Sequence, residues 1–204
     1  MGTSQKRFKD PVHGYITVPT HFCNSLIDTC IFQRLRHIEQ TSMRCLYPGA
    51  RHDRFIHSLG VYHLGCKAIA RIEEVLPPRL KRLTCWPNYR ATFEIACLMH
   101  DCGHAPFSHT CEKFYNHTEQ AKEGTDKKRA NAWLLQQCRS DSRFASDFQL
   151  LDAAPADHEA FSAALMIDFF GDPIRELGAD PVLAARLITG CRYDDPQTDE
   201  QRLA

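Results

Sequence analysis

The sequence predicts a mostly α-helical protein of one domain that begins with a short β arm. Apolar residues recur at three- and four-residue steps through most of the chain, as they do in helices with one packed face. Strand-like alternation is confined to a stretch near the N-terminus, and prolines and glycines separate the helical segments. A length of 204 residues suits one domain with its own core better than two.

The β arm is expected in "DPVHGYITVP", residues 10 to 19. The apolar residues that alternate there with polar ones are Val12, Tyr15, Ile16 and Val18, and prolines and a glycine bound the stretch. The pattern then changes to helical spacing from Asn24 to Ile38. That segment is therefore expected to form one helix with one apolar face.

The longest helical signal runs from Arg54 to Leu76 and ends at two prolines. A further helix, Thr92 to about Asp101, is apolar nearly all round and is expected to be central. The residues expected on or near the packed face of the longest helix are Phe55, Leu59, Leu64, Ala68, Ile69, Ile72 and Val75.

The second half of the chain alternates polar and helical segments. Residues 116–132 are polar and charged, and are expected to form a solvated loop or an exposed helix. Apolar periodicity returns at 132–135, 160–170 and 181–188.

Composition excludes several classes of protein. The formal net charge is zero, so bulk charge gives no support for nucleic acid as a partner. The chain shows no signal peptide and no long apolar run, which predicts a soluble intracellular protein without a membrane partner and does not separate cytoplasm from nucleus. Ten cysteines without an export signal or a CxxC pair indicate reduced thiols.

The segment "CLMHDCGHAPFSH" concentrates three histidines and an aspartate. His100 and Asp101 are adjacent, and adjacent side chains on a helix diverge by about 100 degrees. They can share a metal ion only where the helix ends, and Gly103 and Pro106 predict that end. Imidazole with carboxylate suits a divalent Fe, Mn, Zn, Ni or Mg ion.

His57 and Arg54 lie upstream at helical spacing on one face, where they can complete such a site. A metal can polarise a phosphoryl oxygen and activate water, and a guanidinium can bind a phosphate through two donors. His104 and His109 are expected to transfer protons or to contact phosphate. For any one of these histidines, the alternative is a structural hydrogen bond.

His57 followed by the doublet His100–Asp101 resembles the HD phosphohydrolase signature H...HD...D. The stretches "DPVHGYI", "IDTCIFQRLRHIEQ", "YPGARHDRFIHSLGVYHLG" and "HDCGHAPFSH" together resemble the deoxynucleoside triphosphate (dNTP) triphosphohydrolase branch of that superfamily. The resemblance runs from about Arg7 to His109 and returns from His158 to Phe170. It implies an HD-domain helical bundle that converts a dNTP and water to a deoxynucleoside and triphosphate.

The resemblance also implies roles for individual residues. His57, His100 and Asp101 match metal ligands, and manganese is among the candidate ions. Arg54 matches a phosphate contact and Gln40 a contact to the sugar hydroxyl. The matched catalytic residues, with His109 as proton donor to the leaving 5′ oxygen, are His104, His109, His158 and Glu112.

A regulatory site is implied by Asp28, Gln33 and Arg36, which match positions that bind an activating guanine nucleotide between subunits. This interpretation implies a homo-oligomer, or pairing with a longer relative. The alternative is that Asp28 caps a helix and that the other two side chains are exposed surface.

The final metal ligand of the family is not found in this sequence. The resemblance places it in a segment spelled roughly DVDKxDY, and nothing similar follows His158. The chain is therefore expected to be a C-terminally truncated, partial HD domain with weakened metal binding and low activity. Two alternatives stay open: a non-catalytic nucleotide-binding or oligomerising relative, and an HD phosphohydrolase of another nucleotide or phosphate ester.

Overall fold

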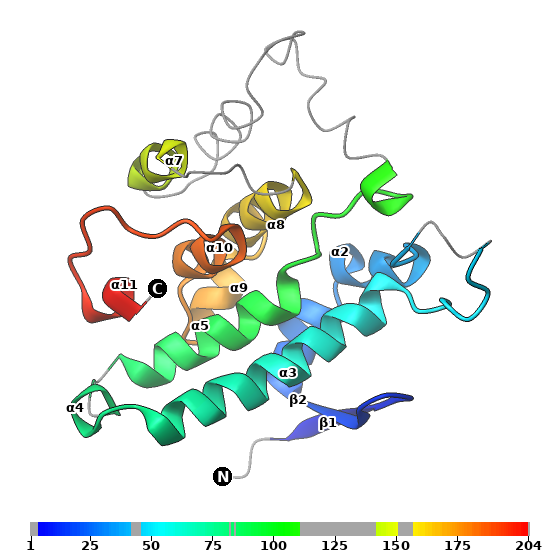
Figure 1. Cartoon of the computed structure of the whole chain (residues 1–204), viewed down its shortest axis with the longest axis horizontal. Coiled ribbons are helices and arrows are strands. Elements are labelled where there is room, and N and C mark those ends of the chain that lie inside the picture. The colour runs from blue at the N-terminus through cyan, green and yellow to red at the C-terminus, as the bar shows by residue number, and fades with distance from the viewer. Residues whose placement is uncertain are drawn as a thin grey trace, which may run out of the picture.

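The computed structural model describes residues 4–41, 46–81, 83, 85–110, 142–150 and 157–203. This part of the chain is mostly helical with one two-stranded sheet, which confirms the predicted fold class. In Figure 1 the sheet lies on one side of the two longest helices, and the C-terminal helices lie on the other. The predicted polar segment 116–132 falls outside the described residues, and the single domain over the whole chain stays a prediction.

The N-terminal arm is an antiparallel hairpin of β1, Gln5–Asp10, and β2, Gly14–Pro19. Asp10 closes its turn, because Oδ1 accepts hydrogen bonds from the backbone N–H groups of Val12 at 2.8 Å and His13 at 2.7 Å. Ile16 and Val18 are buried, as their alternation predicted, whereas Val12 and Tyr15 of the same pattern are exposed, because Val12 lies in the turn and Tyr15 on the opposite face of β2 from Ile16. The hairpin therefore packs one face on the helices and leaves the other to solvent.

The prediction of one helix from Asn24 to Ile38 is wrong. After α1, Thr20–Phe22, the chain forms a π-helical turn η1, Cys23–Ile27, then α2, Cys30–Gln33, and a 3₁₀ turn η2, Arg34–His37. Thr29 interrupts the helix with an extended ψ of 152°. Its hydroxyl donates to the Leu26 carbonyl at 2.7 Å and accepts from the Phe32 N–H, so a side chain replaces the helical hydrogen bonds here.

Two long helices, α3 at Arg54–Val75 and α5 at Trp86–Met99, pack side by side, with α4 at Pro78–Lys81 between them in sequence. The α3 bounds confirm the prediction to within one residue, and Asp53 caps its first turn by accepting from the Ile56 N–H at 2.8 Å. The α5 helix starts six residues before the predicted Thr92. Ile95, Leu98 and Met99 are buried, so the prediction of a central helix is confirmed.

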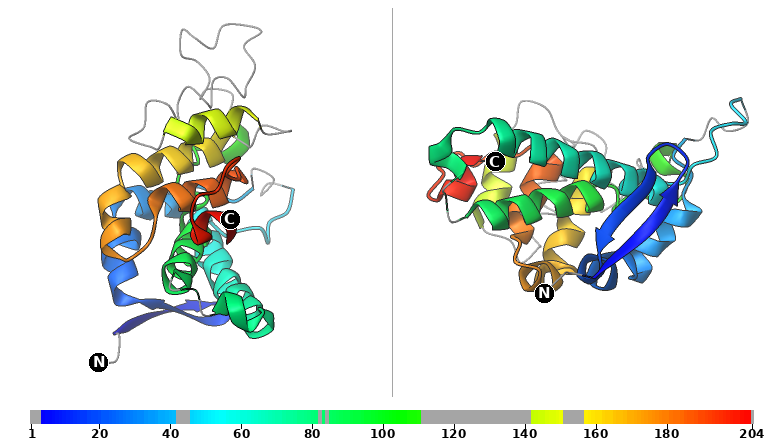
Figure 2. Two further views of the ribbon diagram at one scale, coloured as in Figure 1. Left: turned by 90° about the vertical axis from the view of Figure 1, so that its left-hand side faces the viewer. Right: turned by 90° about the horizontal axis from the view of Figure 1, so that it is seen from below.

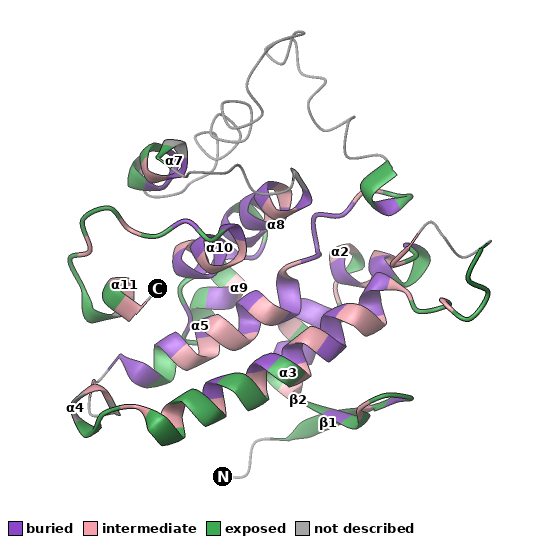
Figure 3. Cartoon of the chain, in the orientation of Figure 1, coloured by how far each residue is buried: buried purple, intermediate pink, exposed green. Residues whose placement is uncertain are grey.

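The predicted packed face of α3 is partly wrong. Leu64, Ile72 and Val75 are 52%, 43% and 66% exposed, and Ala68 is exposed as well. The face that packs includes Phe55 and Leu59 in the first half and Ile69 in the second. Figure 3 shows the reason: the second half of α3 lies at the edge, and its outer surface is exposed over the described part of the molecule.

The remaining helices form a second layer over α5. The α8 and α10 helices pack on each other, and α10 also contacts α5 (Figure 2). Both confirm predicted helices, with α8 beginning three residues before the expected residue 160. The bounds are α7 Ser142–Gln149, α8 Asp157–Asp168, α9 Gly171–Glu176, α10 Pro181–Thr189 and α11 Asp199–Leu203.

A buried arginine holds this second layer together. Arg186 of α10 forms an ion pair with Asp147 of α7 at 2.7 Å, and its guanidinium lies 3.7 Å from the ring centroid of Tyr193. Its Nη1 also donates to the Arg192 carbonyl at 3.0 Å. One side chain therefore fixes α7 and the segment after α10 to the same helix.

Two further predictions concern the whole chain. Seven of the ten cysteines lie within the described residues as free thiols, and the reduced state of the whole chain stays a prediction. None of the described helices combines the length and the apolar character needed to cross a bilayer.

Candidate active site

The candidate site forms where the first turns of α3 meet the segment that follows α5. The α5 helix ends at Met99, and the chain then turns tightly, with the Cys102 N–H donating to the Met99 carbonyl at 3.0 Å and the His104 N–H to the Asp101 carbonyl at 3.0 Å. The helix end predicted from Gly103 is therefore present. We call residues 100–109 the HD loop.

The first group of side chains is the expected metal-ligand triad, His57, His100 and Asp101, whose ligand atoms all lie within 4.8 Å of one another. The Nε2 atoms of the two histidines are 3.3 Å apart, and the Asp101 carboxylate lies 3.6 Å from His57 and 3.4 Å from His100. His100 Nδ1 lies 3.0 Å from the Cys97 carbonyl, which directs Nε2 toward the other two residues. Two imidazoles and a carboxylate at this spacing fit a divalent metal ion.

The charge state of the triad suits a cation. Burial alone would raise the pKa of Asp101, but the charges of His100 and Arg54 and the Arg54 hydrogen bond outweigh it and lower that pKa below its usual value. Burial lowers the pKa of His57. At neutral pH the carboxylate is therefore ionised and the His57 imidazole is neutral, which are the forms that bind metal.

Arg54 is buried, with 2% exposure, and joins α3 to the HD loop. Its Nη1 donates to Asp101 Oδ2 at 2.7 Å, and its Nε donates to Ser108 Oγ at 2.9 Å. Its Nη2 lies 3.4 Å from the Gln40 carbonyl and 3.3 Å from His109 Nε2. The arginine predicted to bind phosphate thus lies between the two groups of histidines.

Gln40 lies beside the site, as the sequence resemblance implied. Its backbone N–H donates to the His52 carbonyl at 3.2 Å. Its side-chain oxygen Oε1 is buried and has no hydrogen-bond donor among the described residues. A buried amide oxygen in that state favours a ligand that brings a donor, such as a hydroxyl group.

The second group consists of His104, His109 and His158, whose ring nitrogens also lie within 4.8 Å of one another. The rings of His104 and His158 stack with centroids 3.8 Å apart and planes 17° apart, and His109 meets both edge-on. The lone pairs of nearly parallel stacked rings run side by side and do not converge on one ion. This group therefore suits an oxyanion or a proton transfer better than a second metal.

The three histidines differ in environment. His104 is fully buried, and burial together with the neighbouring His158 lowers its pKa to about 2, so it is neutral at physiological pH. His109 is exposed and is therefore the member of the group that a ligand can reach. Asp101 Oδ1 lies 3.5 Å from His104 Nε2 and 4.0 Å from His158 Nε2, so one carboxylate borders both groups.

The HD loop is held in an unusual backbone conformation. Phe107 and Ser108 have φ values of 65° and 52°, in the left-handed region that disfavours residues with a Cβ atom. Ser108 Oγ receives the Arg54 hydrogen bond and donates to the Glu39 carbonyl. Contacts from α3 and from the segment before it therefore hold the strained turn beside His109.

The HD loop also lies directly against α8. A Cβ atom at Gly103 would lie 2.4 Å from the Ser162 backbone nitrogen and 2.6 Å from the His158 carbonyl oxygen. The Gly103 N–H donates to Ser162 Oγ at 2.8 Å. Only glycine permits this approach, which brings His158 of α8 beside His104.

The residues of the expected regulatory site lie on the segment 28–36. Gln33 Nε2 donates to the Ile27 carbonyl at 2.8 Å, and its Oε1 accepts from Arg36 Nε at 2.8 Å. The Arg36 guanidinium carbon also lies 3.5 Å from the centroid of the Phe55 ring, and Asp28 Oδ2 forms an ion pair with Lys6 Nζ at 2.7 Å. The structure brings Gln33 and Arg36 together, and it adds Lys6, which the sequence reasoning did not single out.

One predicted residue has no structural outcome, because Glu112 lies outside the described residues. One residue beside the site was missed: Arg34 of η2 contacts the HD loop. Its position in "FQRLRH" gave no local signal for this contact, since the partners lie about 70 residues away.

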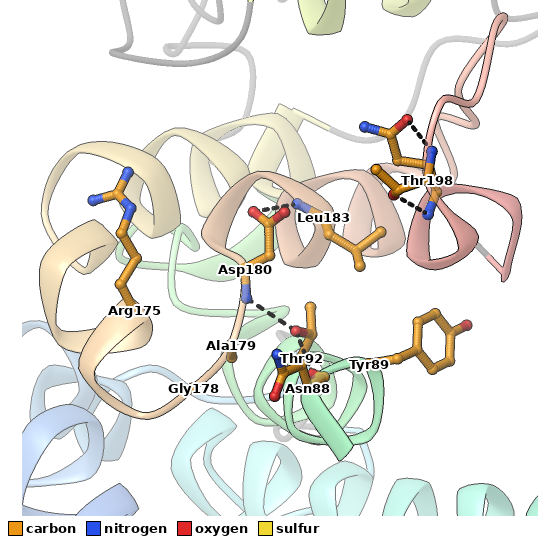
Figure 4. A pocket seen from close by; sticks show the side chains of 10 residues that line it. Asn88, Tyr89, Thr92, Arg175, Gly178, Ala179, Asp180, Leu183 and Thr198 are labelled. Atoms are coloured by element: carbon orange, nitrogen blue, oxygen red, sulfur yellow. Dashed lines mark hydrogen bonds between the residues drawn. The ribbon is translucent and has the colours of Figure 1, made fainter. Parts of the chain in front are cut away.

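Two cavities lie near these elements. One of about 590 Å³ borders His57 and is lined by the hairpin turn, residues 49–52 and the first half of α3. The other, of about 460 Å³, lies between α5, α10 and α11, where the Asp180 N–H donates to Thr92 Oγ1 at 3.0 Å (Figure 4). The second cavity contains none of the predicted site residues.

A helical bundle with two histidines and a carboxylate at a helix end, beside a buried arginine, is the arrangement of a metal-dependent hydrolase. The HD domain family matches residues 54–173. This range covers more than half of the chain and contains the His57–His100–Asp101 triad, so the chain belongs to the HD domain family. The family and the triad together support a metal-dependent HD phosphohydrolase.

Three curated proteins are similar in sequence to about half of this chain. The deoxynucleoside triphosphate triphosphohydrolase SAMHD1 of Danio rerio is 44% identical over 109 residues, which cover 51% of this chain and 16% of that protein. The SAMHD1 homolog of Dictyostelium discoideum, with the same enzyme name, is 40% identical over 112 residues, 54% of this chain and 21% of its own length. The uncharacterized protein YwfO of Bacillus subtilis is 40% identical over 116 residues, 56% and 25%. The chain thus spans a quarter or less of each of these relatives.

Proposed function

We propose that this chain acts on deoxynucleoside triphosphates as a metal-dependent triphosphohydrolase. The observation that carries the proposal is the position of Asp101, which borders both the expected metal ligands and the second histidine group while it pairs with Arg54. A metal, a phosphate-binding cation and a proton donor are the three parts that hydrolysis of a phosphate ester requires. Two relatives named above carry the name of this activity.

His57, His100 and Asp101 would hold the divalent ion, for which manganese is one candidate. When bound, such an ion polarises a phosphoryl oxygen and lowers the pKa of a water molecule. The three residues orient the ion through fixed donors, since His100 is held by the Cys97 carbonyl and Asp101 by Arg54. The 590 Å³ cavity reaches His57 from the solvent side.

Arg54 and Gln40 would position the substrate. The guanidinium of Arg54 donates to a phosphate oxygen close to the metal ligands, and it needs no large movement because four groups already hold it. The buried Oε1 of Gln40 accepts a hydrogen bond from the sugar hydroxyl. These two contacts would place the phosphate that carries the 5′ oxygen beside His109.

His109 would supply the proton. Water attacks the phosphorus atom attached to the 5′ oxygen and gives up one proton to solvent, and the bond between phosphorus and the 5′ oxygen breaks. The 5′ oxygen takes its proton from His109, so the products are a deoxynucleoside and triphosphate. His109 is exposed, whereas His104 is neutral and buried, so His109 can regain its proton from solvent. His104 and His158 would contact the phosphate oxygens.

The proposal includes regulation by a guanine nucleotide at Asp28, Gln33 and Arg36, in a site shared with a second copy of the chain or a longer relative. The support is local: Arg36 and Asp28 are exposed and charged, and Gln33 lies between them in sequence and contacts Arg36. A carboxylate accepts hydrogen bonds from a guanine edge, and an arginine binds phosphate.

The test measures product from dGTP with Mn²⁺ by ion chromatography. The proposal expects inorganic triphosphate from the unchanged chain, none from the His100→Ala, Asp101→Ala variant, and an unchanged rate from His21→Ala, an exposed histidine of α1 outside both histidine groups. Retained dGTP binding without product contradicts the enzyme and supports a non-catalytic nucleotide-binding relative. Release of phosphate or pyrophosphate from another ester identifies a different HD phosphohydrolase.

A further inference from the structure

We propose that Arg34 is a positioning residue, which holds the HD loop in the conformation that aligns the metal ligands with the second histidine group. The inference deepens the proposed function and rests on it for the meaning of the loop. Arg34 itself touches neither a candidate ligand atom of the metal nor a ring nitrogen of the histidines.

The contact is a two-point clamp on the loop backbone. Arg34 Nη1 donates to the His104 carbonyl at 2.6 Å, and Nη2 donates to the Cys102 carbonyl. These two peptide groups lie on either side of Gly103, directly after Asp101. A guanidinium is planar and presents its donors in a fixed fork, so it sets the separation and orientation of both carbonyls at once.

Arg34 bonds two backbone carbonyl groups that lie beyond the end of helix α5. The helix ends at Met99, and carbonyl groups beyond a helix end have no partner within the helix. Charge-assisted hydrogen bonds are shorter and stronger than neutral ones, so a cationic fork suits these carbonyls. The described residues provide a second attachment, because the Gly103 N–H donates to Ser162 Oγ at 2.8 Å.

These two contacts attach the HD loop to two elements that lie far apart in the sequence. Arg34 comes from the turn η2 near the N-terminus, and Ser162 comes from α8. Asp101 lies just before the clamped peptides and His104 belongs to one of them. A rotation of either peptide would therefore change the 3.5 Å separation between the Asp101 carboxylate and His104 Nε2.

A purely structural role makes a different prediction. A cation near the C-terminal end of α5 stabilises the helix through its dipole, and its loss would weaken the fold as a whole. A positioning role acts on the loop alone. The two are separated by local backbone exchange, by metal affinity and by the division of an effect between kcat and KM.

The experiment compares Arg34→Gln and Arg34→Lys with Arg90→Gln as the matched control. Arg90 is also a partly exposed arginine with two partners, Glu73 and Glu94, and it links α3 to α5 far from the HD loop. The measurements are hydrogen–deuterium exchange of peptides covering 98–107, Mn²⁺ affinity by calorimetry, and kcat and KM with dGTP.

Arg34→Gln is expected to raise exchange in 98–107 roughly tenfold, since each charged hydrogen bond contributes about that factor, and to leave the α3 and α10 peptides unchanged. We expect Mn²⁺ affinity and kcat each to fall roughly tenfold or more with KM little changed, because misplaced groups slow the reaction more than they weaken binding. Arg34→Lys keeps one donor contact and should recover part of each loss. Arg90→Gln should change none of the loop measurements.

Unchanged loop exchange in Arg34→Gln, or an equal rise over all helices, overturns the inference. The exchange and Mn²⁺ measurements need no triphosphohydrolase activity. Faster loop exchange with weaker Mn²⁺ binding in a chain that releases no triphosphate therefore upholds the clamp and refutes the proposed function. Release of triphosphate at the same rate by Arg34→Gln and the unchanged chain upholds the function and refutes the clamp.

Discussion

Replacing Gly103 with alanine tests whether the HD loop and α8 form one rigid unit. The added Cβ would lie 2.4 Å from the Ser162 nitrogen and 2.6 Å from the His158 oxygen. Both are backbone atoms of α8, which cannot turn away as the end of a flexible side chain can. The loop and the helix must therefore separate.

The size of the effect follows from these distances. Ordinary contact begins at 3.4 Å, so the two backbones must move apart by about 1 Å. Overpacking of this kind costs about 1–3 kcal/mol of unfolding free energy, which lowers the Tm of a domain of this size by about 2–12 °C. The same movement carries His158 away from His104, and a displacement of about 1 Å at a catalytic group reduces the rate roughly a hundredfold.

The assay combines thermal unfolding with the triphosphate measurement. Gly49→Ala is the matched control, because no atom lies within 4 Å of its Cβ and its φ is not in the left-handed region. We expect the control to stay within about 0.5 kcal/mol of the unchanged chain. A Gly103→Ala variant with the stability of the control and the rate of the unchanged chain would refute the close approach of loop and helix.

Three further predictions concern stability. The pKa of His104 is about 2 in the folded chain, against an ordinary value of 6.5, so the unfolded chain binds the extra proton and stability falls as pH drops below about 6.5, by up to about 1.4 kcal/mol per pH unit. Urea unfolding at pH 7 and pH 5 should therefore show a smaller loss of stability between the two pH values for His104→Gln than for the unchanged chain. An equal loss would contradict the lowered pKa of His104. Asp147→Ala leaves the Arg186 charge buried without its ion-pair partner and should lower the free energy of unfolding, measured with urea, by about 3–5 kcal/mol. Adding Arg186→Leu should recover part of this loss. A loss below about 1 kcal/mol would show that the pair is solvated. Asp53→Ala removes the cap of α3 and should cost about 1 kcal/mol, seen as a Tm lower by about 2–4 °C, whereas an unchanged Tm would mean that another group serves the Ile56 N–H.

The long helices were predictable because their signals are local. Pro77 and the apolar spacing set the bounds of α3, and the sequence from Pro181 onward did the same for α10. The segment from Asn24 to Ile38 has the same spacing, and yet Thr29 interrupts it. A threonine hydroxyl competes with the helix for backbone groups, and the apolar pattern does not reveal when it wins.

The candidate site divides in the same way. His100, Asp101 and the turn at Gly103 lie in one short segment, so their convergence followed from the sequence. The contact of Gly103 with α8 and that of Arg34 with the HD loop join distant segments, and neither leaves a local pattern. Within the second histidine group, His104 is buried and His109 is exposed, and this difference depends on packing that no spacing rule describes.

The Arg34 contact also bears on where the working unit begins. The family match starts at residue 54, so a fragment cut at that boundary would keep the metal triad and both long helices. It would lack Arg34, and with it the guanidinium that donates to both the Cys102 and the His104 carbonyls. Because that contact closes about 70 residues of chain, the loop can take its final shape only after the N-terminal segment has docked. The order of folding would then run from the long helices to the segment that carries Arg34 and only then to the HD loop, so the candidate site would be completed last.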